Sequence, residues 1–290
     1  MRRIIDSDKE GPMEQQQNDD LAWNARRGNA WADLQPMLDR LFLPFEQILA
    51  DAIPTNRGCH VLDIGCGTGA TTLAIAKRLA TRGGCTGLDV SGVLLEIARR
   101  RAIAEGTTNA HFILGDAQRY RFAPNTFDAV ASRFGVMFFD HPEAAFANIR
   151  SAVRPGGTLA CVVWRSRDDN AFMAAAERAA EPLLGRSDRP DPNAPGQFAF
   201  ADANRVRGIL STAGWDAIKI SPLDVPCTLS KPDLAIYARR MGRIGMILPD
   251  LDEALRAKVT AALDDAFASF LLDDIARFDV ACWMVQAHAG

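Results

Sequence analysis

The sequence has little excess charge of either sign and no long apolar run. Of its 290 residues, 33 are Lys or Arg and 36 are Asp or Glu, which gives a net charge of −3. General nucleic-acid binders are usually basic, and no block of Lys and Arg stands out in this chain. No apolar stretch reaches the length that spans a bilayer. The sequence therefore predicts a protein with neither a nucleic acid nor a membrane as its partner.

The six cysteines form no metal-binding pattern. They are scattered along the chain, at Cys59, Cys66, Cys85, Cys161, Cys227 and Cys282. Charged residues follow the basic start MRRII at the place where a secretory signal would have its apolar core. We therefore expect a cytoplasmic protein with neither a disulfide framework nor a metal site, and the sequence leaves a homodimer open.

Composition divides the chain into a tail and one domain. Residues 6–20 (DSDKEGPMEQQQNDD) are polar and poor in apolar side chains, which predicts a disordered tail over residues 1–20. A single domain is expected over 21–290. Its expected parts are N-terminal helices at 21–55, an alternating strand–helix core at 56–165, helices with a loop and a strand at 166–276, and a closing strand at 277–290.

Short apolar stretches alternate with helical ones from residue 59 onward. Strands are predicted at 59–64, 84–89, 110–114, 127–132 and 158–164, and helices at 70–81, 91–105 and 142–153. This alternation predicts an α/β fold whose mostly parallel sheet is covered on both faces. Further along, the sequence predicts helices at 171–184 and 202–213, a strand near 215–221, helical sequence over 231–274 and a strand at 277–287. Among the N-terminal helices, Pro36 and Pro44 are predicted to mark breaks or helix starts.

Three glycines separate the first predicted strand from the helix after it. In VLDIGCGTG, Gly65, Gly67 and Gly69 lack Cβ atoms, so the backbone can turn sharply and let a ligand approach the amides of the following helix. With Ala70 the run also satisfies the looser dinucleotide pattern G-x-G-x-x-G/A. The loop alone therefore predicts a bound ligand and leaves its identity open.

Three aspartates lie at or just after the ends of three successive predicted strands. Asp63 precedes the first glycine, where a carboxylate suits a ligand with an ammonium group and disfavours a pyrophosphate. Asp89 ends the second strand, where it can accept hydrogen bonds from both ribose hydroxyls. Asp116 follows the third strand and is placed to accept from an exocyclic amine such as that of adenine. Together they indicate a nucleoside that also carries positive charge.

These stretches resemble a known family. VLDIGCGTG, GLDVS, GDAQ, FDAV and RPGG before an apolar strand are similar to the class I S-adenosylmethionine-dependent methyltransferases, most strongly over residues 59–165. The leading helices, GWDAIKI and the closing strand are similar to a bacterial small-molecule branch. The resemblance implies a Rossmann-like seven-stranded methyltransferase sheet whose last strand runs antiparallel to its neighbour. It also implies an N-terminal helical lid and a helical insertion before the last strand.

The same resemblance implies that residues 56–165 bind S-adenosylmethionine, with S-adenosylhomocysteine as the product. The methionine moiety would lie on Asp63 and on the loop after it, whose residues are Gly65, Cys66, Gly67, Thr68 and Gly69. The adenosine would lie on the next strand ends, with Asp89 at the ribose and with Val90, Asp116 and Ala117 at the adenine.

The resemblance implies two further groups of site residues, one at the methyl end of the cofactor and one in the N-terminal helical lid. The first consists of Arg133, Phe134 and Val136, and the second of Trp31 and Gln35. Trp31 could instead have a structural role, because Trp23 and Trp31 could both be core residues that fix a helix in place. His141 is a weak candidate for a general base, and HPEAAF is better explained as the start of a helix with Pro142 in its first turn.

The expected reaction is methyl transfer to a small-molecule acceptor by in-line displacement, with proximity and orientation as the main catalytic effects. An apolar acceptor is suggested by residues that could equally fill the core, namely Met137, Phe138, Phe139, Met241 and Met246. Two alternatives stay open. One is an NAD-dependent oxidoreductase, which Asp63 disfavours, and the other is a non-catalytic cofactor-binding or regulatory protein on the same fold.

Overall fold

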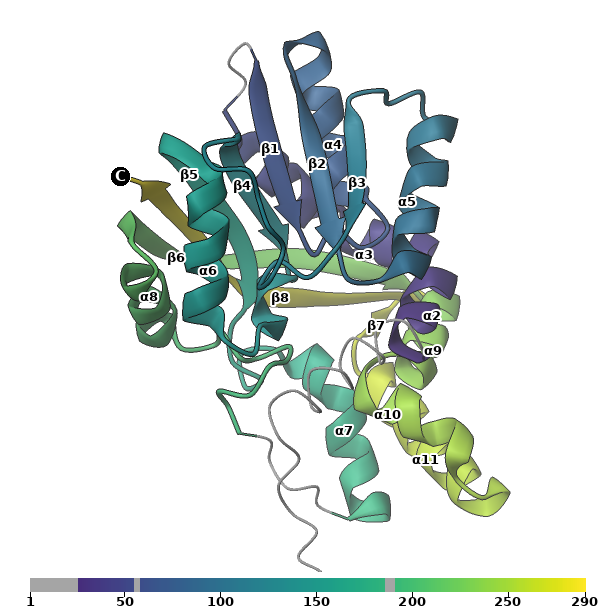
Figure 1. Ribbon diagram of the computed structural model, residues 1–290. Coiled ribbons are helices and arrows are strands. Elements are labelled where there is room, and N and C mark those ends of the chain that lie inside the picture. Colours follow the sequence, from purple (N-terminus) through teal and green to yellow (C-terminus); the bar gives the residue numbers. More distant parts are fainter. Residues whose placement is uncertain (1–25, 55–57, 186–190) are drawn as a thin grey trace, which may run out of the picture.

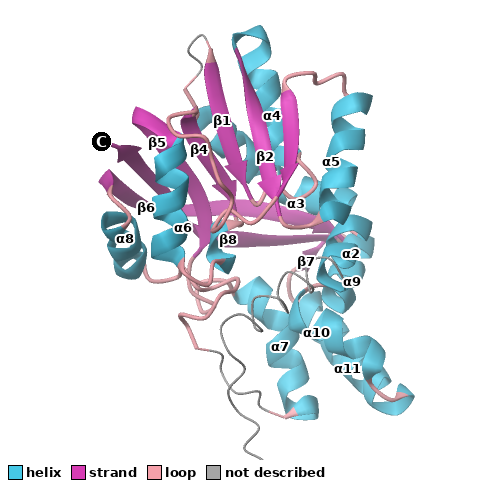
Figure 2. Cartoon of the chain, in the orientation of Figure 1, coloured by secondary structure: helices cyan, strands magenta, loops and turns pink. Residues whose placement is uncertain are grey.

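A mixed β-sheet forms the centre of the molecule (Figures 1 and 2). The computed structural model describes residues 26–54, 58–185 and 191–290, so the predicted tail and Trp23 lie outside the described residues. The strands are β1 (Cys59–Ile64), β2 (Gly83–Asp89), β3 (Ala110–Leu114), β4 (Phe127–Arg133), β5 (Val153–Trp164), β6 (Trp215–Ser230), β7 (Leu271–Leu272) and β8 (Ile275–Ala289). Seven of them follow the order β3-β2-β1-β4-β5-β8-β6, and the two-residue β7 pairs with β8.

The strand directions create a crevice at one edge of the sheet. Strands β1 to β5 run parallel, and β8 runs antiparallel to both β5 and β6. From β1 the chain first builds outward through β2 and β3, and then returns to the other side of β1 for β4 and β5. Because the strand order reverses between β1 and β4, a crevice opens at the carboxyl ends of the strands, where ligands of open α/β sheets bind.

Helices cover both faces of this sheet, as predicted. They are α2 (Arg26–Asp33), α3 (Gln35–Ala52), α4 (Ala70–Leu79), α5 (Gly92–Ala104), α6 (Pro142–Ala152), α7 (Ala171–Leu184), α8 (Ala203–Thr212), α9 (Lys231–Arg240), α10 (Gly242–Ile247) and α11 (Glu253–Ala268). The described residues also form the short 3-10 helices η1 (Ala80–Arg82), η2 (Val136–Phe138) and η3 (Leu248–Asp250). In Figure 1, α6 and α8 lie on the near face, and α3 and α4 lie on the far face. The helices α7 and α9–α11 gather below the carboxyl ends of the strands.

The predicted fold class is confirmed, and the differences lie at element boundaries. The last strand is antiparallel, and helices α9–α11 precede it, as the resemblance implies. Strand β6 continues to Ser230, well past the predicted end at residue 221. Pro222 and Pro226 concealed this extension, and β6 tolerates both because it is the edge strand, where one side of the backbone has no strand partner. The predicted helical sequence over 231–274 ends at Ala268, before β7.

The two N-terminal prolines have different positions in α3. Pro36 lies in the first turn of the helix, where its missing N–H costs no hydrogen bond, as the sequence predicts. Pro44 lies inside the helix and marks neither a start nor a break. Buried side chains of α3, among them Leu41, Phe45 and Leu49, pack it onto the common core, and this packing compensates for the proline.

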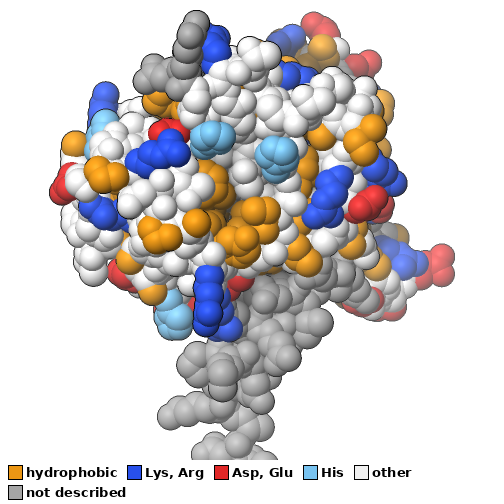
Figure 3. All heavy atoms as spheres, turned by 45° about the horizontal axis from the view of Figure 1, so that its top comes forward, with side chains coloured by type: hydrophobic (Ala, Val, Ile, Leu, Met, Phe, Trp, Pro, Cys, Tyr) orange, Lys and Arg blue, Asp and Glu red, His pale blue; other side chains and the backbone are white. Residues whose placement is uncertain are grey.

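Three further observations concern the distribution of charge on the surface, the cysteines and the composition of the helices. On the face shown in Figure 3, basic and acidic side chains are distributed among neutral and apolar ones. All six cysteines are buried with free thiols. Within the described residues, no helix combines the length and the apolar composition that crossing a membrane requires.

Candidate active site

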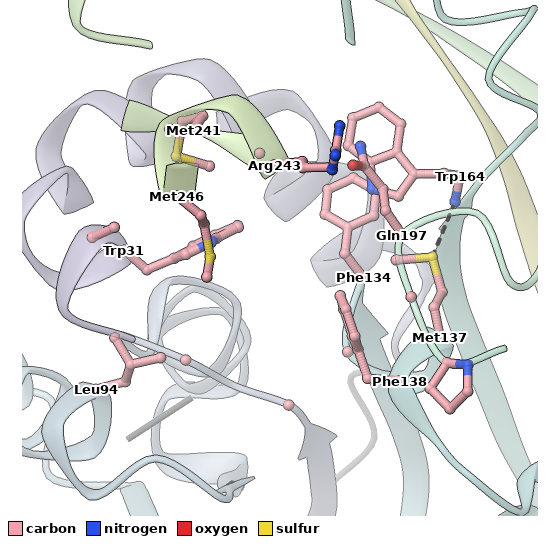
Figure 4. A pocket seen from close by; sticks show the side chains of 18 of the residues that line it. Trp31, Leu94, Phe134, Met137, Phe138, Trp164, Gln197, Met241, Arg243 and Met246 are labelled. Carbon is pink, nitrogen blue, oxygen red and sulfur yellow. Dashed lines mark hydrogen bonds between the residues drawn. The ribbon is translucent and has the colours of Figure 1, made fainter. Parts of the chain in front are cut away.

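A cavity of about 960 Å³ lies at the crevice predicted by the strand order. One side is formed by residues after β1, β2 and β3, including Gly65, Asp89 and Asp116. The other side is formed by η2, by the end of β5 and by helices α2, α7, α9 and α10. Figure 4 shows apolar and aromatic side chains from these elements around the space. The cavity has the size of the larger small-molecule sites, which span roughly 300–1,000 Å³.

The glycine loop lies directly beside the cavity. Gly65 has a φ of +66°, and a Cβ there would stand 2.7 Å from the Cα of Gly135, which follows β4. Gly67 has a φ of +54°, and a Cβ there would meet nothing within 4 Å. Gly65 is therefore needed for contact between two loops, whereas Gly67 leaves open space on the ligand side.

Asp89 and Asp116 both line the cavity. The Asp89 carboxylate accepts hydrogen bonds from the N–H groups of Gly67 at 2.7 Å and Ser91 at 2.9 Å. Burial raises the pKa of Asp89, and these backbone hydrogen bonds oppose the rise. Asp116 accepts from the N–H of Gln118 at 2.9 Å. Both carboxylates are thus oriented by backbone amides and keep acceptor capacity toward the cavity.

Asp63 lies beneath the loop and is not among the residues that line the cavity. Its side chain is fully buried, and the Thr72 hydroxyl donates a hydrogen bond of 2.6 Å to its Oδ2. No described residue donates to its Oδ1. Burial raises the pKa of Asp63 to about 7, against the opposing hydrogen bond from Thr72 and the charge of Arg133. A carboxyl in this position can influence a cationic ligand through charge, without a direct contact.

A small side pocket of about 50 Å³ adjoins the cavity at the loop. It shares Gly67 and Arg133 with the main cavity and adds Gln35, Asp39 and Thr68. Gln35 donates to the Asp39 carboxylate, which also forms an ion pair of 2.9 Å with Arg101. The Arg101 guanidinium in turn donates to the Thr68 carbonyl at 2.9 Å. The lining of the side pocket therefore includes a cation, Arg133, and a carboxylate, Asp39.

Aromatic rings form the wall between the glycine loop and α2. The ring of Phe134 stacks on Trp164, with centroids 4.8 Å apart, and meets Phe42 edge-on at 5.3 Å. Trp31 stacks on Phe42 at 6.4 Å. Phe134 has a φ of +63°, which is uncommon for a bulky residue and is typical of sites where surrounding structure holds a strained backbone. Figure 4 shows Phe134 and Trp164 together on one side of the cavity.

The structure brings most of the predicted site residues to the two spaces. Those that line the main cavity are Trp31, Gly65, Gly67, Asp89, Val90, Asp116, Ala117, Arg133 and Phe134. Those that line only the side pocket are Gln35, Cys66 and Thr68. Those that line neither are Asp63, Gly69, Val136 and His141.

His141 has a structural position outside the cavity. It is exposed and directly precedes the first turn of α6, and its backbone N–H donates to Gln118 Oε1 at 3.1 Å. Val136 is fully buried, whereas its neighbour Met137 lines the cavity. The sulfur of Met137 accepts a hydrogen bond of 3.4 Å from the backbone N–H of Trp164. This arrangement assigns no base role to His141.

Several residues of the cavity and of the side pocket had no role in the sequence prediction. Trp164 could have been found, because it ends β5 at the same edge of the sheet as Asp63 and Asp89. Asp39 had a weaker signal, since it lies one helical turn after Gln35. Tyr237 and Arg243 had none, because only the packing of α9 and α10 against the strand ends brings them to the cavity.

Comparison with known proteins agrees with this geometry. Residues 61–157 match a family model described as a methyltransferase domain. An uncharacterised protein of Mycobacterium tuberculosis is 30% identical over 202 residues, which cover 69% of this chain and 72% of that protein. A demethylmenaquinone methyltransferase of Staphylococcus haemolyticus is 26% identical over 171 residues, which cover 56% of this chain and 71% of that protein.

A solved structure shares the fold. Phosphoethanolamine N-methyltransferase 2 of Haemonchus contortus, in complex with S-adenosylhomocysteine, aligns with a TM-score of 0.56 at 17% identity. The alignment covers 93% of this chain and 58% of that chain. With the parallel sheet, the glycine loop after β1 and the matched family model, these similarities establish that the chain belongs to the class I S-adenosylmethionine-dependent methyltransferases.

Proposed function

We propose that this protein transfers the methyl group of S-adenosylmethionine to a small molecule with a largely apolar body. One observation carries the proposal: a single cavity joins the carboxylates at the ends of β2 and β3 to an apolar chamber under α7, α9 and α10. Its volume of about 960 Å³ leaves room for an acceptor beside a nucleoside.

The residues present suit an adenosyl ligand that carries an amino-acid group. The Asp89 carboxylate is oriented to accept from ribose hydroxyls, and Asp116 with Ala117 would take the adenine edge beside Val90. The open space at Gly67 lets a ligand approach the backbone. The side pocket offers Arg133 for a carboxylate and Asp39 for an ammonium group. Asp63, whose Oδ1 has no donor among the described residues, would add negative potential beneath the loop when a cationic ligand favours its ionised form.

The chemistry assigned to the chain is positioning and exclusion of water. When bound, S-adenosylmethionine supplies a methyl group on a sulfonium that is already an activated leaving group. Phe134 and Trp164 form a rigid apolar wall beside the loop, and Trp31 on α2 closes the opposite side. Holding a nucleophile in line with the methyl group in a dry cavity can account for a large part of the rate.

The acceptor chamber has mainly apolar walls. Its apolar side chains from η2, α7, α10 and the residue before α10 are Met137, Phe138, Met173, Met241, Ile244 and Met246. Methionines adapt to irregular ligands, and the chamber therefore favours an apolar acceptor. The similarity to a protein named as a demethylmenaquinone methyltransferase supports a small-molecule acceptor.

Calorimetry with S-adenosylmethionine and S-adenosylhomocysteine tests the cofactor assignment. We expect Asp89→Ala to weaken binding by about 1–3 kcal/mol, the scale of losing hydrogen bonds to a charged group. Asp224→Ala is the control, because Asp224 is an exposed residue of β6 whose partner is Arg165. Unchanged affinity in Asp89→Ala would refute the ribose role, and binding of NAD in place of both ligands would favour the oxidoreductase.

Turnover is tested separately from binding. Purified protein with S-adenosylmethionine is incubated with panels of apolar and polar acceptors, and formation of S-adenosylhomocysteine is measured. We expect product with apolar acceptors. Tight cofactor binding without turnover on any panel would instead support the non-catalytic alternative.

A further inference from the structure

Four arginines from α9, α10 and the loop before α7 lie around the acceptor chamber, and they differ in their partners. Arg239 donates to both oxygens of Asp264, at 2.6 and 2.7 Å. Arg240 forms an ion pair of 2.6 Å with Asp33, and Arg167 forms one of 2.6 Å with Glu177. The side chain of Arg243, in the first turn of α10, has no hydrogen bond or ion pair with any residue that the structure describes.

Arg243 points into the chamber. In Figure 4 its side chain extends from α10 toward the wall that contains Phe134 and Gln197. Arg243 is an exposed residue, so its guanidinium is accessible to a ligand that enters the cavity. A positive charge that reaches into the cavity without a protein partner is suited to an anionic ligand.

A second donor lines the same chamber. The Tyr237 side chain is 9% exposed, and its hydroxyl donates to the thioether sulfur of Met173 at 2.7 Å. A thioether is a weak acceptor, so an oxygen atom of a ligand would replace it favourably. Burial raises the pKa of Tyr237 above its ordinary value, so the phenol stays protonated and acts as a donor.

The acidic side chains of the lining already have partners. Asp33 and Glu177 are paired with arginines, and Asp89 and Asp116 accept from backbone amides. Asp140 also has an interaction partner. Among the lining residues that the structure describes, none is a histidine. The chamber thus offers donors to an acceptor molecule and no evident group to remove a proton from it.

We propose that the acceptor enters as an anion, an apolar molecule that carries an ionised oxygen such as a phenolate, an enolate or a carboxylate, and that Arg243 and Tyr237 bind this oxygen. The inference rests on the proposed methyl transfer. The ionised acceptor gives an electron pair to the methyl carbon while the carbon–sulfur bond breaks and its pair stays on sulfur. No proton has to be removed, and the product of this step is neutral at the methylated group, so Arg243 holds it less tightly.

Matched anionic and neutral probes test the proposal. The full-length protein is saturated with S-adenosylhomocysteine and titrated by calorimetry with 2-naphthoate and with 2-naphthamide, which have similar shapes. We expect the anion to bind at least about tenfold more tightly than the amide, the scale of one charge-assisted hydrogen bond. Arg243→Gln should abolish this preference while leaving the affinity for the amide unchanged.

Two further variants make the test specific. Arg256→Gln is the control, because Arg256 is an exposed residue of α11 outside the cavity lining. It should keep the preference for the anion. Tyr237→Phe retains the buried ring and should weaken 2-naphthoate binding about threefold or more by removing one hydrogen bond. Unchanged 2-naphthoate affinity in Tyr237→Phe would remove Tyr237 from the proposal.

The outcomes separate this inference from the proposed function. Equal affinity for the two probes, no binding of either, or a preference that persists in Arg243→Gln would overturn the anionic acceptor. If S-adenosylhomocysteine itself binds neither the wild type nor Arg243→Gln, the proposed methyl transfer fails instead.

Discussion

Two aspartates at neighbouring strand ends differ in their partners. Asp89 accepts from two backbone amides and lines the cavity. Asp63 is fully buried, with the Thr72 hydroxyl on one oxygen and no described partner on the other. Burial raises the pKa of Asp63 to about 7. The ionisation of this one side chain therefore falls near neutral pH and should depend on whether a cation lies in the cavity.

The stability of the ligand-free protein should depend on pH through Asp63. Its folded pKa of about 7 lies above the ordinary value of 3.8, so the folded state binds the proton more tightly. The free energy of unfolding must then fall as pH rises between these two values, and level off above the folded pKa. In Asp63→Asn this contribution is absent. From pH 5 to pH 8 the wild type should lose about 2–3 kcal/mol relative to the variant.

Urea denaturation of both proteins at pH 5 and pH 8 measures this difference, and their comparison cancels the other titrating groups. The same pH change in both proteins would show that Asp63 is ionised throughout. Calorimetry adds a second readout: a cationic ligand should favour the carboxylate, so binding near pH 7 should release protons to the buffer.

At the residue scale, the sequence could predict the groups that belong to strand ends. Gly65, Gly67, Asp89 and Asp116 line the cavity because each follows or ends a parallel strand, and all carboxyl ends meet at one edge. Tyr237 could not be predicted in the same way. It reaches the cavity only through the tertiary packing of α9, which no local pattern specifies.

At the element scale, the loop after β1 rests on the loop after β4. A Cβ on Gly65 would stand 2.7 Å from the Cα of Gly135, and a Cβ on Gly135 would stand 2.6 Å from the carbonyl oxygen of Ile64. Neither contact can be relieved by a side-chain rotation, since both atoms belong to the backbone. The two loops that flank the switch in strand order are therefore fixed relative to each other.

Alanine at Gly65 and at Gly67 should have different effects. Both residues have positive φ, which costs alanine about 1 kcal/mol in either place. Only Gly65→Ala also forces the β4 loop to move, so it should reduce the free energy of unfolding by about 1–3 kcal/mol more than Gly67→Ala. Gly67→Ala should mainly weaken S-adenosylhomocysteine binding, because its methyl group occupies the open space beside the loop. Urea denaturation and calorimetry measure the two effects, and equal destabilisation would contradict the loop contact.

The bounds of strands and helices were predicted accurately where the local sequence pattern determines them. The prediction failed at the edge of the sheet, where a strand tolerates residues that are unusual in central strands. The strands at 59–64 and 110–114 and the helix at 171–184 have the predicted bounds. The second half of β6 was missed because its prolines argue against a strand, yet an edge strand accepts them. The two-residue β7 exists only by pairing with β8, so its sequence carries no signal.

At the scale of the whole molecule, parts distant in sequence meet over the cavity. Asp33 of α2 pairs with Arg240 of α9 at 2.6 Å, and Arg40 of α3 pairs with Asp233 at 2.8 Å. Apart from the Asp233 side chain these groups are well exposed, and such pairs contribute only about 0.2–1 kcal/mol each and weaken in salt. Trp31 on α2 lines both the cavity and the side pocket, so these ion pairs, which join α2 and α3 to α9, help to hold the wall of the ligand site in place.

Ligand release should therefore become faster as salt rises. S-adenosylhomocysteine carries no net charge, so salt acts mainly on the protein's own ion pairs. We expect its dissociation rate, measured by stopped-flow displacement, to increase about two- to fivefold from 0.05 M to 0.5 M NaCl. The double variant Asp33→Asn with Arg40→Gln should release the ligand faster at low salt and show little further increase. Asp274→Asn, which removes the exposed pair between Asp274 and the first residue of α9, Lys231, and involves neither α2 nor α3, should behave as the wild type. A salt dependence that survives in the double variant would show that these ion pairs do not hold the site closed.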